Sequence, residues 1–141
     1  MSLSTYQKVF SLEGGIEKEE LLNYQEEGYN LKFADYFLWR LTADEIYETV
    51  KAKCNSDELN LDFISNSIPY GEGDDNILDP KFVKNQMNIL LTGIRNTKNE
   101  IETDSESHKL LERAQADAEK MNELCSFCDT KGFSIAIYLD A

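Results

Sequence analysis

The chain has 141 residues and carries 27 acidic against 14 basic residues, a formal net charge of −13. This excess of carboxylates argues against nucleic acids and anionic membrane surfaces as partners, because both are bound through cations. Hydrophobic residues make up 41% of the chain and aromatic residues 11%, which is enough apolar material for a core and excludes a disordered composition.

Length and cysteine content predict one soluble domain. Residues 1–141 fall in the size range of a single globular domain. No run approaches the ~18 apolar residues of a membrane-spanning helix, and the N-terminus lacks a basic segment followed by an apolar one. The three cysteines are few and odd in number, as expected for reduced thiols. We therefore expect a cytoplasmic protein.

The N-terminal part alternates strand and helix signals. Residues 5–12 show period-two apolar spacing and predict a strand that ends before a glycine pair. Residues 16–27 combine leucines with glutamates and predict a short helix closed by Gly28. Residues 29–41 again show period two, interrupted at Asp35, and predict a second strand, although the apolar run at 36–39 alone also fits a helix.

The middle part begins with a helix start signal. Thr42 and Glu45 have the spacing of a capping box, in which the threonine hydroxyl bonds the Glu45 amide and the glutamate reaches back. A helix to about Lys53 follows. Residues 57–76 begin as a short helix or strand and end as a loop, because one proline and two glycines interrupt them.

The C-terminal part carries the clearest patterns. Asp79 and Pro80 form an N-cap and a first helical residue, and helical apolar spacing predicts a helix over 80–98. A polar connection leads to a second long helix over 106–130, and residues 133–140 predict an interior strand. The order indicates an α+β class: a small sheet of about three strands packed against four or so helices, with the helices dominant.

The cysteines and the single histidine suggest a metal or redox site that helix geometry does not support. Cys125 and Cys128 have CxxC spacing, and Cys54 with His108 formally completes four zinc ligands. On one continuous helix, however, His108 and Cys125 lie ~25 Å apart. The CxxC pair also falls at a helix C-terminal end, where the dipole raises a thiol pKa. We expect core thiols, a solvated His108, and no catalytic pair.

The loop at residues 70–80 gathers carboxylates. Glu72, Asp74 and Asn76 offer alternating oxygens as in a calcium loop, but the bidentate glutamate that closes such a loop is absent, because the twelfth position holds Val83. A solvated acidic loop ahead of the helix is the simpler interpretation, with a weak cation site as the alternative. No glycine motif for nucleotides is present, so we expect no cofactor.

Charge distribution leads to the functional hypothesis. Residues 41–79 carry ten acids and two bases, so more than half of the net charge lies there. Carboxylates beside aromatic residues suit a hot spot for a basic protein. The proposed contact residues are Asp44, Glu45, Tyr47, Glu48, Tyr70, Glu72, Asp74 and Asp75. The hypothesis is a small, non-enzymatic binding protein, for instance an immunity-type or antitoxin-type inhibitor of a cationic nuclease.

Two alternatives belong to other classes. A divalent-metal-binding protein or metal-dependent hydrolase would use Glu72, Asp74 and Asp75, with Glu58 or Asp62. A structural or oligomeric module would instead pair its two long helices between subunits.

Overall fold

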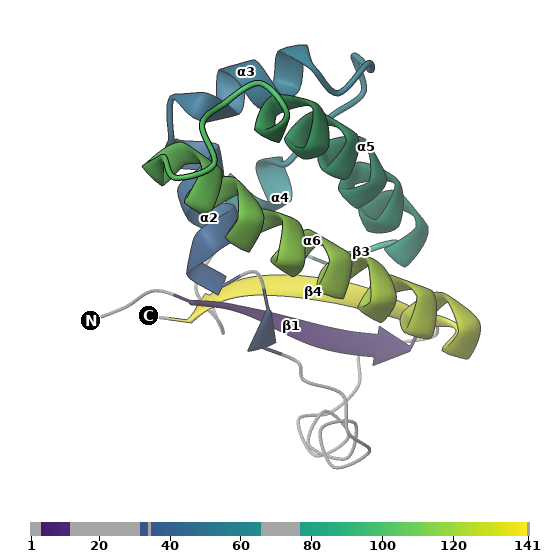
Figure 1. The fold of residues 1–141 in the computed structure, drawn as a ribbon. Coiled ribbons are helices and arrows are strands. Elements are labelled where there is room, and N and C mark those ends of the chain that lie inside the picture. The colour runs from purple at the N-terminus through teal and green to yellow at the C-terminus, as the bar shows by residue number, and fades with distance from the viewer. Residues whose placement is uncertain (1–3, 12–31, 34, 66–76, 141) are drawn as a thin grey trace.

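The computed structural model describes residues 4–11, 32–33, 35–65 and 77–140 (Figure 1). The strands are β1 (Ser4–Ser11), β2 (Lys32–Phe33), β3 (Ile77–Leu78) and β4 (Phe133–Asp140). The helices are α2 (Asp35–Ala43), α3 (Ile46–Ala52), α4 (Asp62–Ser65), α5 (Pro80–Lys98) and α6 (Glu106–Lys131). The helix predicted over residues 16–27 lies outside the described residues, as does the loop over 66–76.

The strands form one antiparallel sheet in the order β2-β1-β4-β3. β1 and β4 pair along their whole length, from Ser4 opposite Asp140 to Ser11 opposite Phe133. β2 and β3 add two residues each. The predicted α+β class with a sheet of about three strands is therefore wrong: helices make up most of the described residues, and beyond the β1–β4 pair the β structure consists of the two-residue strands β2 and β3.

The strand predicted over residues 29–41 is also wrong, because most of that segment is α2. Of the described residues in that segment, only Lys32–Phe33 pairs as a strand, with β1. In a helix, Leu38 and Leu41 lie one turn apart on the same face, and both are fully buried. Leu38 and Leu41 have helical spacing and would point to opposite faces of a strand, so the tertiary contacts of this helical face decide the conformation.

The predicted helices over 80–98 and 106–130 are confirmed as α5 and α6. The Asp79 carboxylate accepts a hydrogen bond from the Lys81 amide at 2.9 Å, and Pro80 follows as the first helical residue. α6 begins at Ser105, whose hydroxyl accepts from the His108 amide at 3.1 Å. It ends at Gly132, which has a φ of 73° that suits glycine.

The predicted capping box at residues 42–45 does not form. The Thr42 hydroxyl donates to the Trp39 carbonyl at 2.9 Å, inside α2. The Asp44 carboxylate accepts from the Ile46 amide at 2.9 Å, so an aspartate two residues later holds the start of α3. Thr42 and Asp44 can both bond to nearby backbone groups, and the sequence pattern alone does not show which of the two holds the start of α3.

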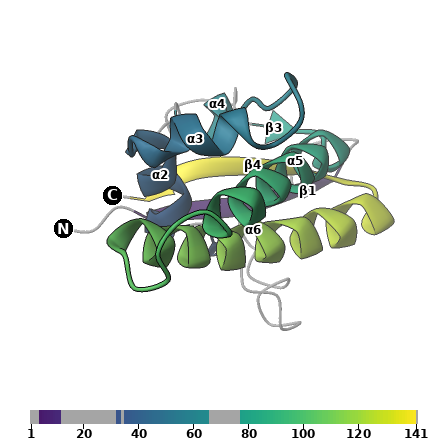
Figure 2. The same ribbon diagram turned by 45° about the horizontal axis from the view of Figure 1, so that its top comes forward.

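The helices lie on one face of the β1–β4 pair, with α5 and α6 side by side (Figures 1 and 2). The core between them contains fully buried residues from both helices and from β4, among them Met87, Leu90, Met121 and Ile135. The Lys84 ammonium donates to the Ser126 hydroxyl at 2.7 Å across the α5–α6 contact. The pairing of the two long helices is thus made within the chain.

Candidate functional site

Half of the predicted contact residues lie on or next to α3. Asp44, Glu45 and Glu48 are exposed there, and Tyr47 is partly buried against the core. The other four, Tyr70, Glu72, Asp74 and Asp75, lie outside the described residues. The structure therefore brings together the first half of the predicted site.

Tyr47 is the centre of this group. Burial raises the pKa of Tyr47 to about 12, and the negative fields of Asp62, Cys54 and Glu48 add to the effect. The Lys51 ammonium lies 5.1 Å from the centroid of the Tyr47 ring and forms an ion pair with Glu48 at 3.0 Å. Carboxylates from α3 and from the first turn of α4 are thus gathered around one aromatic side chain.

The acids of this region are all on the surface. Between residues 44 and 62 the chain has six carboxylates and two lysines, and all six acidic residues are exposed. They are Asp44, Glu45, Glu48, Asp57, Glu58 and Asp62. We call this set the α3–α4 acidic face.

A groove of about 620 Å³ lies beside this face, between α3 and the connection from α5 to α6. Its apolar part is Ile46 and Ile101, both half-buried against the core. Glu100 and Glu102 also line it and are exposed. Residues 99–107 contain four acids and no base, and the groove lining combines two isoleucines with two of these glutamates.

Sequence reasoning missed the groove because residues 99–107 gave only the signal of a polar connection. One detail of the segment was informative: Ile101 is its only apolar residue and stands between two glutamates. An isolated isoleucine in a polar loop is well placed to contribute apolar surface to a binding site. Its partner across the groove, Ile46, belongs to a helix more than fifty residues away in the chain.

Specific polar contacts hold the two walls of the groove in place. The Asn96 amide donates to the Lys53 carbonyl at 2.8 Å and ties the end of α3 to α5. The Lys53 ammonium also forms an ion pair with Glu100 near the surface, which adds little to the stability of this arrangement. The Ser105 hydroxyl donates to the Glu102 carbonyl at 2.7 Å, which fixes the connection before α6. The groove is therefore built on contacts within the fold.

Glycine at position 93 allows α3 to approach α5 closely. A Cβ atom added there would lie 2.5 Å from the Val50 carbonyl oxygen and 3.1 Å from Cys54 Cβ. About two turns earlier in α5, the buried Gln86 side chain accepts from the Asn60 amide at 2.6 Å and donates to the Glu58 carbonyl at 3.1 Å. These contacts position the α3–α4 acidic face relative to α5.

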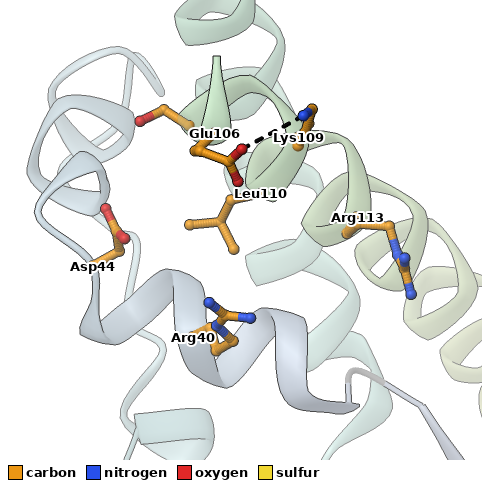
Figure 3. Close-up of a pocket in the computed structure, with 7 residues that line it drawn as sticks. Arg40, Asp44, Glu106, Lys109, Leu110 and Arg113 are labelled. Carbon is orange, nitrogen blue, oxygen red and sulfur yellow. Dashed lines mark hydrogen bonds and ion pairs between the residues drawn. The ribbon is translucent and has the colours of Figure 1, made fainter. Parts of the chain in front are cut away.

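A second concavity, of about 280 Å³, lies between α2 and the first turns of α6. Its lining carries the opposite sign of charge, with Arg40, Lys109 and Arg113 against Asp44 and Glu106. Figure 3 shows Leu110 between the two helices, with the side chains of Arg40 and Asp44 on α2 and the segment that follows it. Lys109 and Glu106 form an ion pair at 3.5 Å.

The cysteines and the histidine do not form a metal site. Cys125 and Cys128 are fully buried, as expected for core thiols, and burial raises the pKa of Cys128 to about 12. The expectation of a solvated His108 is wrong, since only 7% of it is exposed. Its Nδ1 lies 3.6 Å from a Glu112 oxygen.

Within the described ranges, no group of three or more histidine, cysteine, aspartate or glutamate side chains is arranged to hold a metal ion. The carboxylates of the metal-binding alternative at residues 72–75 lie outside those ranges. Among the described helices, none combines the length and apolar character needed to cross a bilayer. Comparison of the chain with protein-family models, with curated proteins and with solved structures found no match.

Proposed function

We propose that the protein is a binding module that docks a basic segment of a partner protein in the groove between α3 and residues 99–107. The observation that carries this proposal is the pairing of two apolar side chains, Ile46 and Ile101, with exposed glutamates on the groove. An inhibitor of a cationic nuclease, of the immunity or antitoxin type, belongs to this class.

The composition of the groove favours a protein partner that is basic and amphipathic. Protein interfaces commonly have an apolar centre that excludes water and a polar rim that sets orientation. Here a leucine or similar side chain would pack on the two isoleucines, while lysine or arginine side chains would face Glu100 and Glu102. The α3–α4 acidic face extends the same sign of charge along the outside of α3.

The net charge of the chain supports the association kinetics of such a complex. A surface of one sign raises the rate at which an oppositely charged partner is encountered, by about tenfold to a thousandfold at low ionic strength. This steering weakens as salt shortens the range of the field, which is ~10 Å at about 0.1 M. Binding by this protein is therefore expected to be strongly salt-dependent.

A labelled peptide tests the proposal directly. The probe carries lysine and arginine on one face of a helix and leucine on the other, and fluorescence anisotropy follows its binding at low and moderate salt. We expect saturable binding that weakens as salt is raised. Replacing Glu100 and Glu102 by glutamine removes two carboxylates from the groove and is expected to weaken binding by roughly threefold to tenfold at low salt.

The matched control is Glu119→Gln with Glu123→Gln, two exposed acids farther along α6. It removes the same charge but leaves the groove intact, since Glu119 lies ~21 Å along the helix from Ser105. Equal weakening by the two variants would show that net charge alone attracts the peptide. Binding that does not change with salt would contradict the docking mechanism itself.

A further inference from the structure

One of the two glutamates that line the groove is already paired with a lysine of the chain. Lys51 and Lys53 are the two basic residues of segment 41–79. The Lys53 ammonium forms an ion pair with Glu100 on the groove, whereas the Lys51 ammonium pairs with Glu48, outside the groove lining. A cation of the chain itself therefore occupies a carboxylate that the proposed partner would use.

The pair between Lys53 and Glu100 is exchangeable. The Glu100 side chain is 61% exposed and the Lys53 side chain 31%, so a cation from outside can reach the carboxylate. Exposed ion pairs of this kind contribute little to stability. Lys53 is also the C-cap residue of α3, where the helix dipole still favours its positive charge once Glu100 has taken another partner. Exchanging the ammonium for another cation therefore costs the fold little.

The structural role of Lys53 lies in its main chain. Its carbonyl accepts from the Asn96 side-chain amide at 2.8 Å, and its own amide donates to the Thr49 and Val50 carbonyls, each at 3.1 Å. A substitution that changes only the side chain leaves these backbone groups in place. The effect of the ammonium on a ligand of the groove can therefore be measured apart from the packing of α3 on α5.

We propose that Glu100 is the subsite for one arginine side chain of the partner, and that Lys53 competes with this arginine within the chain. The inference rests on the proposed function, because it concerns the same groove. A guanidinium group can bond both oxygens of a carboxylate, which an ammonium does not match. A lysine of the partner would exchange one ammonium for another with little gain, so the groove favours a partner with arginine at this position.

The test measures the affinity of the full chain for the labelled basic peptide by fluorescence anisotropy at low salt. Lys53→Met removes the ammonium, keeps the apolar stem of the side chain and frees Glu100, so binding should tighten by roughly twofold to fivefold. The matched control, Lys51→Met, removes the same charge but leaves Glu100 paired, and should tighten binding by less, through net charge alone. Lys53→Gln replaces Lys53→Met if circular dichroism shows that the latter is misfolded.

Removal of Glu100 tests the mechanism. In a Glu100→Gln protein, Lys53→Met should change the affinity no more than Lys51→Met does. An arginine-only peptide should bind the wild type more tightly than a lysine-only peptide, and Glu100→Gln should reduce this difference; an unchanged difference would overturn the arginine subsite. Equal tightening by the two lysine variants when Glu100 is present would overturn the competition and leave the docking proposal standing. No saturable binding by the wild type or by Lys53→Met would overturn both.

Discussion

The contact between α3 and α5 at Gly93 yields a stability prediction that also concerns the docking groove. Gly93→Ala places a methyl group 2.5 Å from the Val50 carbonyl oxygen and 3.0 Å from Val50 Cγ1. Ordinary contacts begin at 3.4 Å, so α3 must move away from α5 by most of an ångström. The nearest atom belongs to the backbone and cannot rotate away, so the cost falls at the upper end of the range for overpacking, ~3 kcal/mol.

Alanine also brings a gain that opposes this cost. Within a helix it is favoured over glycine by about 1 kcal/mol, so the expected net loss in the free energy of unfolding is about 2 kcal/mol. For a chain of this size that loss lowers the melting temperature by roughly 6 °C. Urea denaturation followed by circular dichroism measures it, and the slope of the unfolding free energy against urea should not change.

The control is Thr92→Ala, one position earlier on α5. Thr92 is half-buried, and its hydroxyl donates to the Asn88 carbonyl at 3.3 Å. The substitution removes this hydrogen bond but raises helix propensity, so the free energy of unfolding should change by no more than ~0.5 kcal/mol. Because α3 forms one wall of the groove, Gly93→Ala should weaken the basic peptide as well, whereas Thr92→Ala should not. A Gly93→Ala protein as stable as the wild type would refute the close approach of the two helices.

Two further predictions concern buried polar and sulfur groups. Gln86→Met keeps the side-chain volume but leaves the Asn60 amide and the Glu58 carbonyl without their partner. We expect the free energy of unfolding, measured by urea denaturation, to fall by about 1–3 kcal/mol. An unchanged value would contradict the two hydrogen bonds. Burial raises the pKa of Cys125 and of Cys128, the latter from 9.0 to about 12, so the folded protein keeps these protons while the unfolded chain releases them. The contribution of these two protonated thiols to stability should therefore be constant below pH 9 and be lost as the pH rises toward about 12. A thiol reagent should modify both cysteines only as fast as the protein unfolds, and rapid modification under native conditions would show that they are accessible.

Local signals predicted the long helices well. Asp79 with Pro80, and Gly132 after a lysine, act through contacts within a few residues, so the sequence contains all that is needed to place those helix ends. The same reasoning failed where two local solutions compete. At residues 42–46 the Asp44 side chain caps α3, while the Thr42 hydroxyl bonds back into α2.

The exposure of His108 was predicted wrongly because its immediate neighbours in the sequence are polar. The apolar stripe of α6 includes Leu111 and Ala114, both fully buried. His108 lies one turn before Leu111 and therefore on the same face. Its polar neighbours along the chain, Ser107 and Lys109, point to other faces and do not report on its environment.

The groove could not be predicted from the sequence, for a different reason. It forms where Ile46 on α3 meets Ile101 after α5, and that meeting depends on the close approach at Gly93 and on the bond from Asn96 to the Lys53 carbonyl. Neither contact has a local signature. The charge of residues 41–79 pointed to the α3 side of the groove. The other side, at residues 99–107, becomes apparent only once the packing of α3 on α5 is known.

The position of Glu100 bears on whether the acids of the groove serve the fold or a partner. Glu48 lies in the first turn of α3 and Glu106 in the first turn of α6, where the helix dipole stabilises a carboxylate. Glu100 follows the end of α5, where the dipole disfavours one, and its ion pair with Lys53 is on the surface and worth little. An acid that contributes little to stability and lines an apolar groove is better explained by a ligand. In Glu100→Gln with Glu102→Gln, stability should therefore change by less than ~1 kcal/mol while peptide binding falls, so a parallel loss of both would assign these glutamates to the fold.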